Sequence, residues 1–98
     1  MRVENMLSSN GNYVPNQFII TDGVRITFQS YDSTIIEIDR EKKILTVFPN
    51  YNYSMTTGKY RNMFLADNGF YGLSNIKDLN KAIEAGTYND YKIILKGA

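Results

Sequence analysis

The sequence predicts a single α+β domain, in which an antiparallel sheet of about five strands carries two helices packed on one face. Apolar and polar residues alternate with a period of two between residues 16 and 49, which is typical of strands. Apolar residues then recur at helical spacing between residues 56 and 86. A last short apolar segment follows at residues 91–95. The expected element order is therefore ββββααβ.

The length of the chain predicts one domain, residues 1–98, around one modest core. Hydrophobic residues make up 43% and charged residues 21%, which is ordinary for a folded protein. We expect residues 1–13 to be loosely ordered, because residues 8–12 form a polar, turn-prone cluster. Pro15 then favours an extended backbone at the residue before it.

The first two strands are expected to form a hairpin. The segment QFIIT is short, apolar and β-branched, and Asp22-Gly23 follows it. This dipeptide favours a type I′ turn, because both central residues of that turn need a positive φ. The next strand alternates between an apolar side, Val24, Ile26 and Phe28, and a polar side, Arg25, Thr27 and Gln29.

A third and a fourth strand continue the meander. Residues 30–33 predict a turn, because Asp32 and Ser33 can bond their own backbone. TIIEID and ILTVFP then read as strands joined by the charged segment REKK, and Pro49 stops the second of them. In these strands we expect the inward face to hold Ile36, Ile38, Ile44 and Phe48, with Leu45 and Val47 on the opposite face.

The first helix is expected after residue 55. Thr56 or Thr57 can cap it by accepting a hydrogen bond from a backbone N–H. Tyr60 and Phe64, together with Met63, then form a helical stripe. The helix should end at residues 68–69, where Asn and Gly tolerate the left-handed conformation.

The second helix and a last strand complete the predicted fold. Ser74 is the expected cap, and Ile76, Leu79 and Ile83 are spaced to share one face. Gly86 should close this helix. YKIIL then predicts a strand over residues 91–95.

Composition limits the chemistry available to the chain. It contains no Cys and no His, so disulfides, zinc fingers, imidazole bases and Ser-His-Asp triads are excluded. The acidic residues at turns and strand ends form no convincing metal site or acid–base pair; they are Asp22, Asp32, Glu37, Asp39 and Glu41. We therefore expect no enzyme, no catalytic residue, no metal and no cofactor.

Charge and hydropathy narrow the classes of partner and the location. The net charge of +1 disfavours both a non-specific duplex binder, which is usually strongly basic, and a mimic of DNA, which must be strongly acidic. No apolar run approaches the ~20 residues that span a bilayer, and the start of the chain lacks the apolar core of a signal peptide. We expect a cytoplasmic protein.

The segment YNYSMTTGKYRNMFL, residues 51–65, is the strongest candidate site. One interpretation makes it only a helix start, with Lys59, Arg61 and Asn62 solvated, since Lys59 and Arg61 lie about 200° apart on a helix and cannot form one flat basic face. The other makes it an anion site. The free N–H groups and the positive dipole end of a helix favour phosphate or carboxylate, Ser54 and the two Thr side chains add donors, and Lys59 adds charge.

A second candidate surface is the polar face of the hairpin, formed by Arg25, Thr27 and Gln29. The alternative interpretation is that these residues form only the solvent-exposed face of an antiparallel sheet. Several aromatic side chains could stack bases or contact a protein, namely Tyr51, Tyr53, Phe70 and Tyr71. The residues leave both uses open.

The segments NQFIITDG, TFQSYDSTI and YSMTTGKYRNMFL resemble a family of small domains from phages and mobile elements of low-GC Gram-positive bacteria. Those domains combine a Q-S-Y-x-S turn with the motif Y-S-x-T-T-x-K-Y-R-N-x-F-L, and the resemblance covers roughly residues 16–65. The family has no defined activity. The resemblance implies one shared constellation of residues: Gln29, Ser30, Tyr31, Ser33, Tyr53, Ser54, Thr56, Thr57, Lys59, Tyr60, Arg61 and Asn62.

The resemblance also implies a role, by analogy with the accessory genes that phages carry. We expect a non-enzymatic phage protein of the host-cell cytoplasm that binds and inhibits a bacterial host-defence protein or ribonucleoprotein, as anti-CRISPR proteins do. The expected binding residues are Tyr53, Ser54, Thr56, Thr57, Lys59, Arg61, Asn62, Gln29, Tyr31 and Arg25. The alternative is a small nucleic-acid-binding module, and an enzyme comes third. The oligomeric state is left open, and a homodimer through an exposed strand edge is one alternative.

Overall fold

A computed structural model describes residues 1–97 of the chain. In chain order the elements are β1 (Arg2–Leu7), β2 (Tyr13–Asp22), β3 (Arg25–Ser30), β4 (Ser33–Asp39), β5 (Ile44–Val47), α1 (Met55–Asp67), the 3₁₀ helix η1 (Tyr71–Leu73), α2 (Ile76–Ala85), β6 (Thr87–Tyr88) and β7 (Tyr91–Leu95). The described residues thus form an α+β fold, as the sequence predicted.

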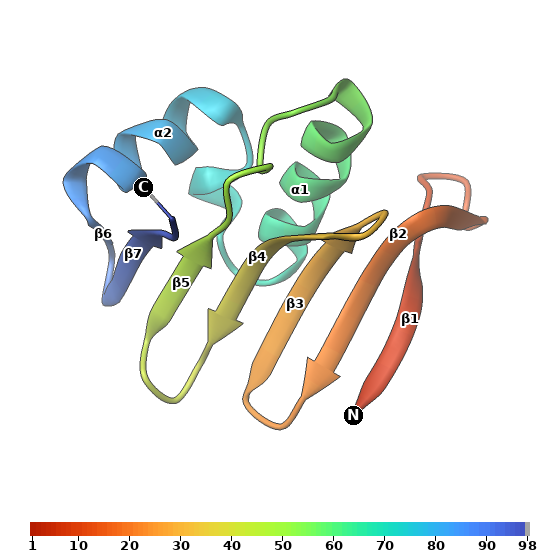
Figure 1. Ribbon diagram of the computed structural model, residues 1–98, viewed down its shortest axis with the longest axis horizontal. Coiled ribbons are helices and arrows are strands. Elements are labelled where there is room, and N and C mark those ends of the chain that lie inside the picture. The colour runs from red at the N-terminus through yellow and green to blue at the C-terminus, as the bar shows by residue number, and fades with distance from the viewer. Residues whose placement is uncertain (98) are drawn as a thin grey trace.

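The strands form one seven-stranded mixed sheet in the order β1-β2-β3-β4-β5-β7-β6 (Figure 1). Strands β1 to β5 are an antiparallel meander, whereas β7 lies parallel to β5. A parallel neighbour needs a long crossover, and the two helices supply it between β5 and β7. The expected five-stranded, purely antiparallel sheet is therefore corrected to seven strands with one parallel pair.

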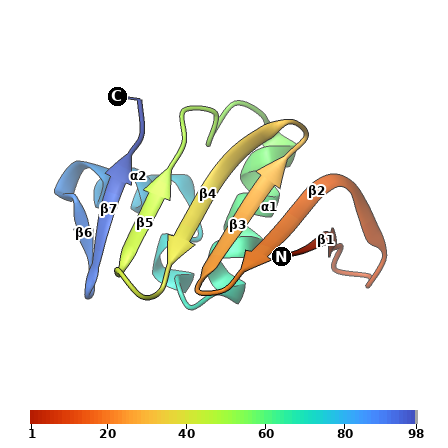
Figure 2. The ribbon, with the colours of Figure 1, turned by 60° about the horizontal axis from the view of Figure 1, so that its bottom comes forward.

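The helices lie on one face of the sheet, as Figure 2 shows with the sheet in front. The fully buried side chains between the two layers include Phe28 of β3 and Phe64 of α1, whose rings stack with centroids 5.7 Å apart. Burial of such rings dominates the energetics of a small core. No helix among residues 1–97 is both long enough and apolar enough to cross a membrane.

The expectation that residues 1–13 are loosely ordered is wrong for most of that segment. Residues 2–7 form β1, which pairs with β2 in a register that joins Arg2 to Thr21 and Asn5 to Phe18. The turn-prone cluster is present, but it connects two strands, with Gly11 at φ 80. The pairing of residues 2–7 with β2 cannot be read from the polar composition of the cluster, because it depends on the side chains of the partner strand.

Two further expectations are corrected, namely the position of the first hairpin turn and the buried face of β5. The first hairpin turns at Gly23-Val24 rather than Asp22-Gly23, because Asp22 pairs with Arg25 across the turn. Gly23 takes the positive φ of 62 that a two-residue turn requires, and Val24 is exposed. In β5, Leu45 and Val47 are the fully buried residues, not Ile44 and Phe48.

The reversal in β5 follows from its pairing. Val47 pairs with Ile36 and Leu45 with Ile38, so these four side chains share the face that the helices cover. A β-bulge between Phe28 and Gln29 explains why the adjacent residues Ile35 and Ile36 are both buried. Strand alternation alone does not reveal which of two apolar faces is covered.

Both helix caps lie one to three residues from the expected positions. Ser54 caps α1, and its Oγ accepts a hydrogen bond from the backbone N–H of Thr57 at 3.1 Å. Asn75 caps α2 by accepting from the N–H of Asp78 at 2.9 Å. Gly86 ends α2 with a left-handed φ of 77, as predicted.

Candidate functional site

The starts of α1 and α2 border one open depression of about 680 Å³ on the surface. We call it the helix-start depression. It is lined by residues 52–55, 58–59, 61–62 and 75–76. The first of these ranges precedes or opens α1, and the last opens α2, so segments at least 20 residues apart in sequence form one surface.

The lining carries positive charge and no negative charge. Lys59 and Arg61 contribute two cations, and none of the ten lining residues is Asp or Glu. The first turn of α1 also holds no acidic residue, so its positive dipole end is not offset locally. Asp78 in the first turn of α2 lies outside the lining. The lining of the depression therefore has a net positive charge.

Arg61 is the most unusual residue of the site. Its side chain is only 2% exposed, yet it lines the depression. Among residues 1–97 the ion pairs join Arg2 to Glu4, Arg25 to Asp39 and Lys43 to Asp90, and none involves Arg61. A buried cation without a carboxylate keeps most of its desolvation cost.

Neutral oxygens hold the Arg61 guanidinium in place. Nη1 donates to the carbonyl oxygen of Tyr51 at 2.6 Å and to Oδ1 of Asn52 at 3.3 Å. Nε and Nη2 both donate to Oδ1 of Asn62, at 3.2 and 2.9 Å. A guanidinium has five N–H donors, so these four bonds leave one N–H of Nη2 without an acceptor among the described residues.

Burial lowers the pKa of the Arg61 guanidinium below its ordinary value, and an electrostatic interaction with the nearby Tyr51 side chain partly opposes that shift. The direction means that the protein destabilises the charged form of this group. Because arginine stays protonated in proteins, the guanidinium keeps its charge, and the free-energy cost of burying that charge remains. An anion bound in the depression would relieve it.

The loop before α1 is fixed from two sides. Arg61 binds the Tyr51 carbonyl, and the Tyr51 hydroxyl donates to Oδ1 of Asn80 on α2 at 2.8 Å. These bonds tie the loop to both helices, and so they hold the two sides of the depression together.

Gly58 lies directly against the Arg61 guanidinium. A Cβ built at this position would lie 3.6 Å from Nη2 and 3.7 Å from Nη1 of Arg61, which is ordinary van der Waals contact. An alanine would therefore fit, but its methyl group would cover the cation. The glycine is not required by the backbone, because its φ is not in the left-handed region.

Apolar side chains stand at the rim of the same depression. Met55 is 93% exposed and Tyr53 is 57% exposed. Lys59 is exposed as well, and its Nζ lies 5.4 Å from the centroid of the Tyr60 ring. The site thus combines exposed apolar contact area with a positive centre.

The structure brings together five of the ten residues expected to bind. Tyr53, Ser54, Lys59, Arg61 and Asn62 all line the helix-start depression. The interpretation in which Arg61 is solvated is wrong, because its side chain is buried and donates to the loop at residues 51–52.

The other five expected residues lie outside the depression. Thr56 is exposed but does not line it, and Thr57 is fully buried, with Oγ1 placed 2.9 Å from Oγ of Ser30. Gln29 donates to the carbonyl oxygen of Tyr31 at 2.8 Å in the β3–β4 turn.

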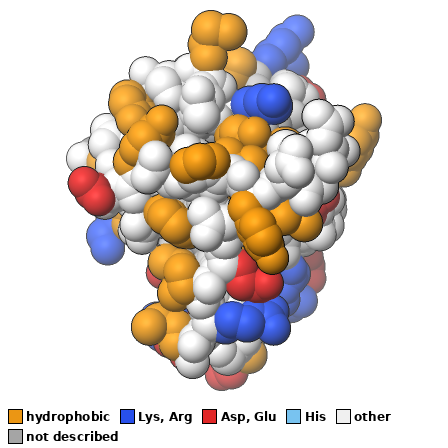
Figure 3. Space-filling model, turned by 90° about the vertical axis from the view of Figure 1, so that its right-hand side faces the viewer, with side chains coloured by type: hydrophobic (Ala, Val, Ile, Leu, Met, Phe, Trp, Pro, Cys, Tyr) orange, Lys and Arg blue, Asp and Glu red, His pale blue; other side chains and the backbone are white. Residues whose placement is uncertain are grey.

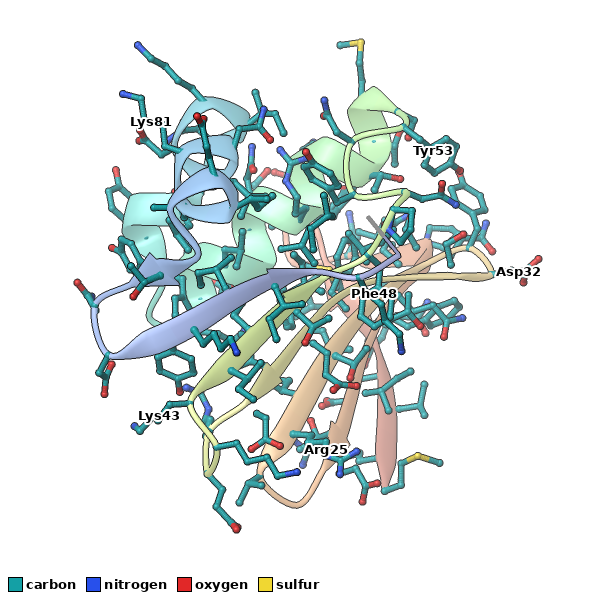
Figure 4. All side chains as sticks on the ribbon, turned by 60° about the vertical axis from the view of Figure 1, so that its left-hand side comes forward. Arg25, Asp32, Lys43, Phe48, Tyr53 and Lys81 are labelled. Carbon is teal, nitrogen blue, oxygen red and sulfur yellow. The ribbon has the colours of Figure 1, made fainter. Side chains whose placement is uncertain are left out.

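Arg25 is remote from this site. It pairs with Asp39 at 3.7 Å and, in Figure 4, lies at the lower end of the sheet, whereas Tyr53 lies at the upper end. The two candidate surfaces are therefore separate. Sequence reasoning had included Gly58 in the anion site as the residue that lets a ligand approach, but it missed the lining residues Asn52, Met55, Asn75 and Ile76. The one available signal for the second helix was Asn75, a residue type that commonly caps helices.

Fold and site together define a small α+β domain whose two helix starts border a cationic surface depression. The chain belongs to a family of unknown function, DUF8033, whose model matches residues 1–81. This match covers the sheet through β5, α1 and the start of α2, and so it includes every residue of the depression. No curated protein and no solved structure matches the chain.

Proposed function

We propose that this chain is a non-enzymatic binding module that seats an anionic group of a larger partner in the helix-start depression. One observation carries the proposal: two cations and no carboxylate line this depression, although the whole chain holds 11 basic and 10 acidic residues. Such segregation of charge is what electrostatic complementarity to an acidic surface requires.

The buried Arg61 supports the same conclusion. Within residues 1–97, one N–H of Nη2 has no acceptor and no carboxylate forms an ion pair with the guanidinium. A carboxylate or phosphate oxygen of a partner would accept from this N–H and restore the lost solvation. Charged hydrogen bonds formed away from water are the strong ones in interfaces.

The partner we propose is a bacterial host-defence protein or ribonucleoprotein, such as a CRISPR effector, bound and inhibited by this chain in the host cell. The motifs Q-S-Y-x-S and Y-S-x-T-T-x-K-Y-R-N-x-F-L motivate this choice by analogy with phage accessory proteins. Tyr53 and Met55, exposed beside the cations, suit a protein partner because such residues anchor interfaces.

The test is to measure binding of the purified chain to a panel of host-defence complexes and to follow phage growth in cells that express it. Lys59→Glu should weaken binding about tenfold or more and reduce protection of the phage. Lys81→Glu is the matched control, since Lys81 is exposed on α2 outside the depression. It should bind as the wild type does.

The proposal fails if the chain binds no complex of the panel and gives no protection to phage. It also fails if Lys59→Glu and Lys81→Glu reduce binding equally, because the effect would then reflect net charge rather than this site.

A second candidate function is the binding of single-stranded nucleic acid. The observation that favours it is the exposed ring of Tyr53 near Lys59, an arrangement in which a base can stack while its phosphate meets the cation. Affinity for a short oligonucleotide should then fall steeply with salt, and Lys59→Ala should flatten that slope. Absence of binding to DNA and RNA oligonucleotides at low ionic strength would eliminate this candidate.

A further inference from the structure

Strand β1 is the long free edge of the sheet. It pairs only with β2, whereas the opposite edge, β6, is two residues long. The outward N–H and C=O groups of a free edge strand offer a template on which another strand can pair. Residues 2–5 pair regularly with β2, and the irregularity lies after Asn5.

Exposed apolar side chains concentrate at this edge. Of the nine large hydrophobic residues that are exposed within residues 1–97, four lie within residues 1–13: Met1 at 89%, Val3 at 57%, Leu7 at 48% and Tyr13 at 78%. Figure 3 shows this side of the molecule, with apolar side chains spread across it among separate charged groups. Pairing at the edge would remove part of this apolar area from water.

The charges on β1 are complementary to those of a second β1 in one antiparallel register. Arg2 and Glu4 lie two residues apart on one face of the strand, with Nε and Oε1 3.1 Å apart, and both side chains are largely exposed. If the two Val3 residues pair across a two-fold axis, Arg2 of each copy faces Glu4 of the other. If the axis passed through Arg2 or Glu4 instead, two identical charged residues would face each other across it, which destabilises a sheet.

We propose that β1 pairs antiparallel with β1 of a second copy of this chain, with the Val3 residues opposite each other, so that a symmetric homodimer shares one continuous sheet. A two-fold interface requires such a self-complementary patch. No residue of the segment 1–5 lines the helix-start depression, so the inference is independent of the proposed function and leaves both depressions of the dimer open.

The test is sedimentation velocity across a wide concentration range, with charge variants of β1. The wild type should dimerise as concentration rises. Arg2→Glu alone and Glu4→Arg alone should each weaken the dimer about tenfold or more, because each places two pairs of like charges across the axis. The double variant Arg2→Glu/Glu4→Arg should dimerise again.

Mixing gives the sharpest readout. The two single variants are each repelled by themselves but complementary to one another, so an equimolar mixture should form a heterodimer. Glu84→Arg, at an exposed position of α2, is the matched control and should dimerise as the wild type does. Thermal unfolding followed by circular dichroism checks that every variant is folded.

Three results would overturn the proposal. The wild type could stay monomeric at every concentration, the single variants could dimerise as well as the wild type, or their mixture could form no heterodimer.

Discussion

The hydroxyl oxygens of Ser30 and Thr57 lie 2.9 Å apart, and both side chains are fully buried. This contact spans 27 residues and joins the end of β3 to the first turn of α1. Ser54 extends it, because its Oγ donates to Oγ1 of Thr57 at 3.1 Å while accepting from the Thr57 N–H. The helix start is therefore anchored to the sheet through a chain of hydroxyl groups.

This anchor predicts energetic coupling between the two buried residues. Ser30→Ala should lower the free energy of unfolding by about 1–2 kcal/mol, because it leaves a buried hydroxyl with one bond fewer. The isosteric Thr57→Val should lower the free energy of unfolding by a comparable or larger amount, since Thr57 also forms a hydrogen bond with Ser54. The double variant should cost about 1 kcal/mol less than the sum of the two. Urea unfolding of the four proteins measures this, and strict additivity would contradict it.

Replacing Gly58 should change stability and partner affinity in opposite directions. Gly58→Ala should raise the free energy of unfolding by up to about 1 kcal/mol, because alanine favours the helix and fits without a clash. The same methyl group covers the Arg61 guanidinium, so affinity for the anionic partner should fall. Urea unfolding and the binding assay with the defence complexes measure the two effects. A variant that is more stable and binds equally well would show that the guanidinium does not contact the partner.

The guanidinium fork of Arg61 predicts that lysine cannot replace it. Arg61→Lys keeps the charge but cannot reach the Tyr51 carbonyl and Asn62 Oδ1 together, so about 1–3 kcal/mol of unfolding free energy should be lost. Lys59→Arg is the control, because Lys59 is exposed, and it should change stability by less than about 0.5 kcal/mol. Urea unfolding of both variants is the measurement, and equal stability of Arg61→Lys and the wild type would contradict the argument.

Gln17 presents the opposite case, a buried group whose removal should help. Its side chain is fully buried in β2, and neither amide atom has a hydrogen-bond partner within residues 1–97. Gln17→Met has a similar volume and should raise the free energy of unfolding by about 1 kcal/mol, because the unpaired amide is lost.

Gln29 provides the matched control for that variant. It is only partly buried and donates to the Tyr31 carbonyl, so Gln29→Met should be neutral or destabilising. Thermal unfolding of both variants decides the matter. A loss of stability in Gln17→Met would indicate that the amide has a favourable role in the fold.

Several elements could be predicted from neighbouring residues alone. The strand at residues 91–95, the turn at residues 30–33 and the glycine end of α2 are where the sequence placed them. Each depends on interactions that span only a few residues, such as a positive φ or an alternating pattern. Ser54, Lys59 and Tyr53 could be recognised as site residues for the same reason, since they flank or open a helix.

The errors share a different cause. The covered face of β5, the parallel neighbour β7 and the strand at residues 2–7 all depend on pairing between distant segments. A periodic pattern identifies a strand but does not name its neighbour, because the free energy of pairing comes from side chains on the other strand.

By itself the sequence determined that this protein is an α+β domain without thiol or imidazole chemistry, with a polar, cation-bearing helix start. Only the tertiary structure decided that Arg61 is buried with no ion-pair partner among residues 1–97 and that the start of α2 lines the same depression. Local patterns follow from residue type and spacing, whereas the environment of a charge is set by whichever distant segments pack around it.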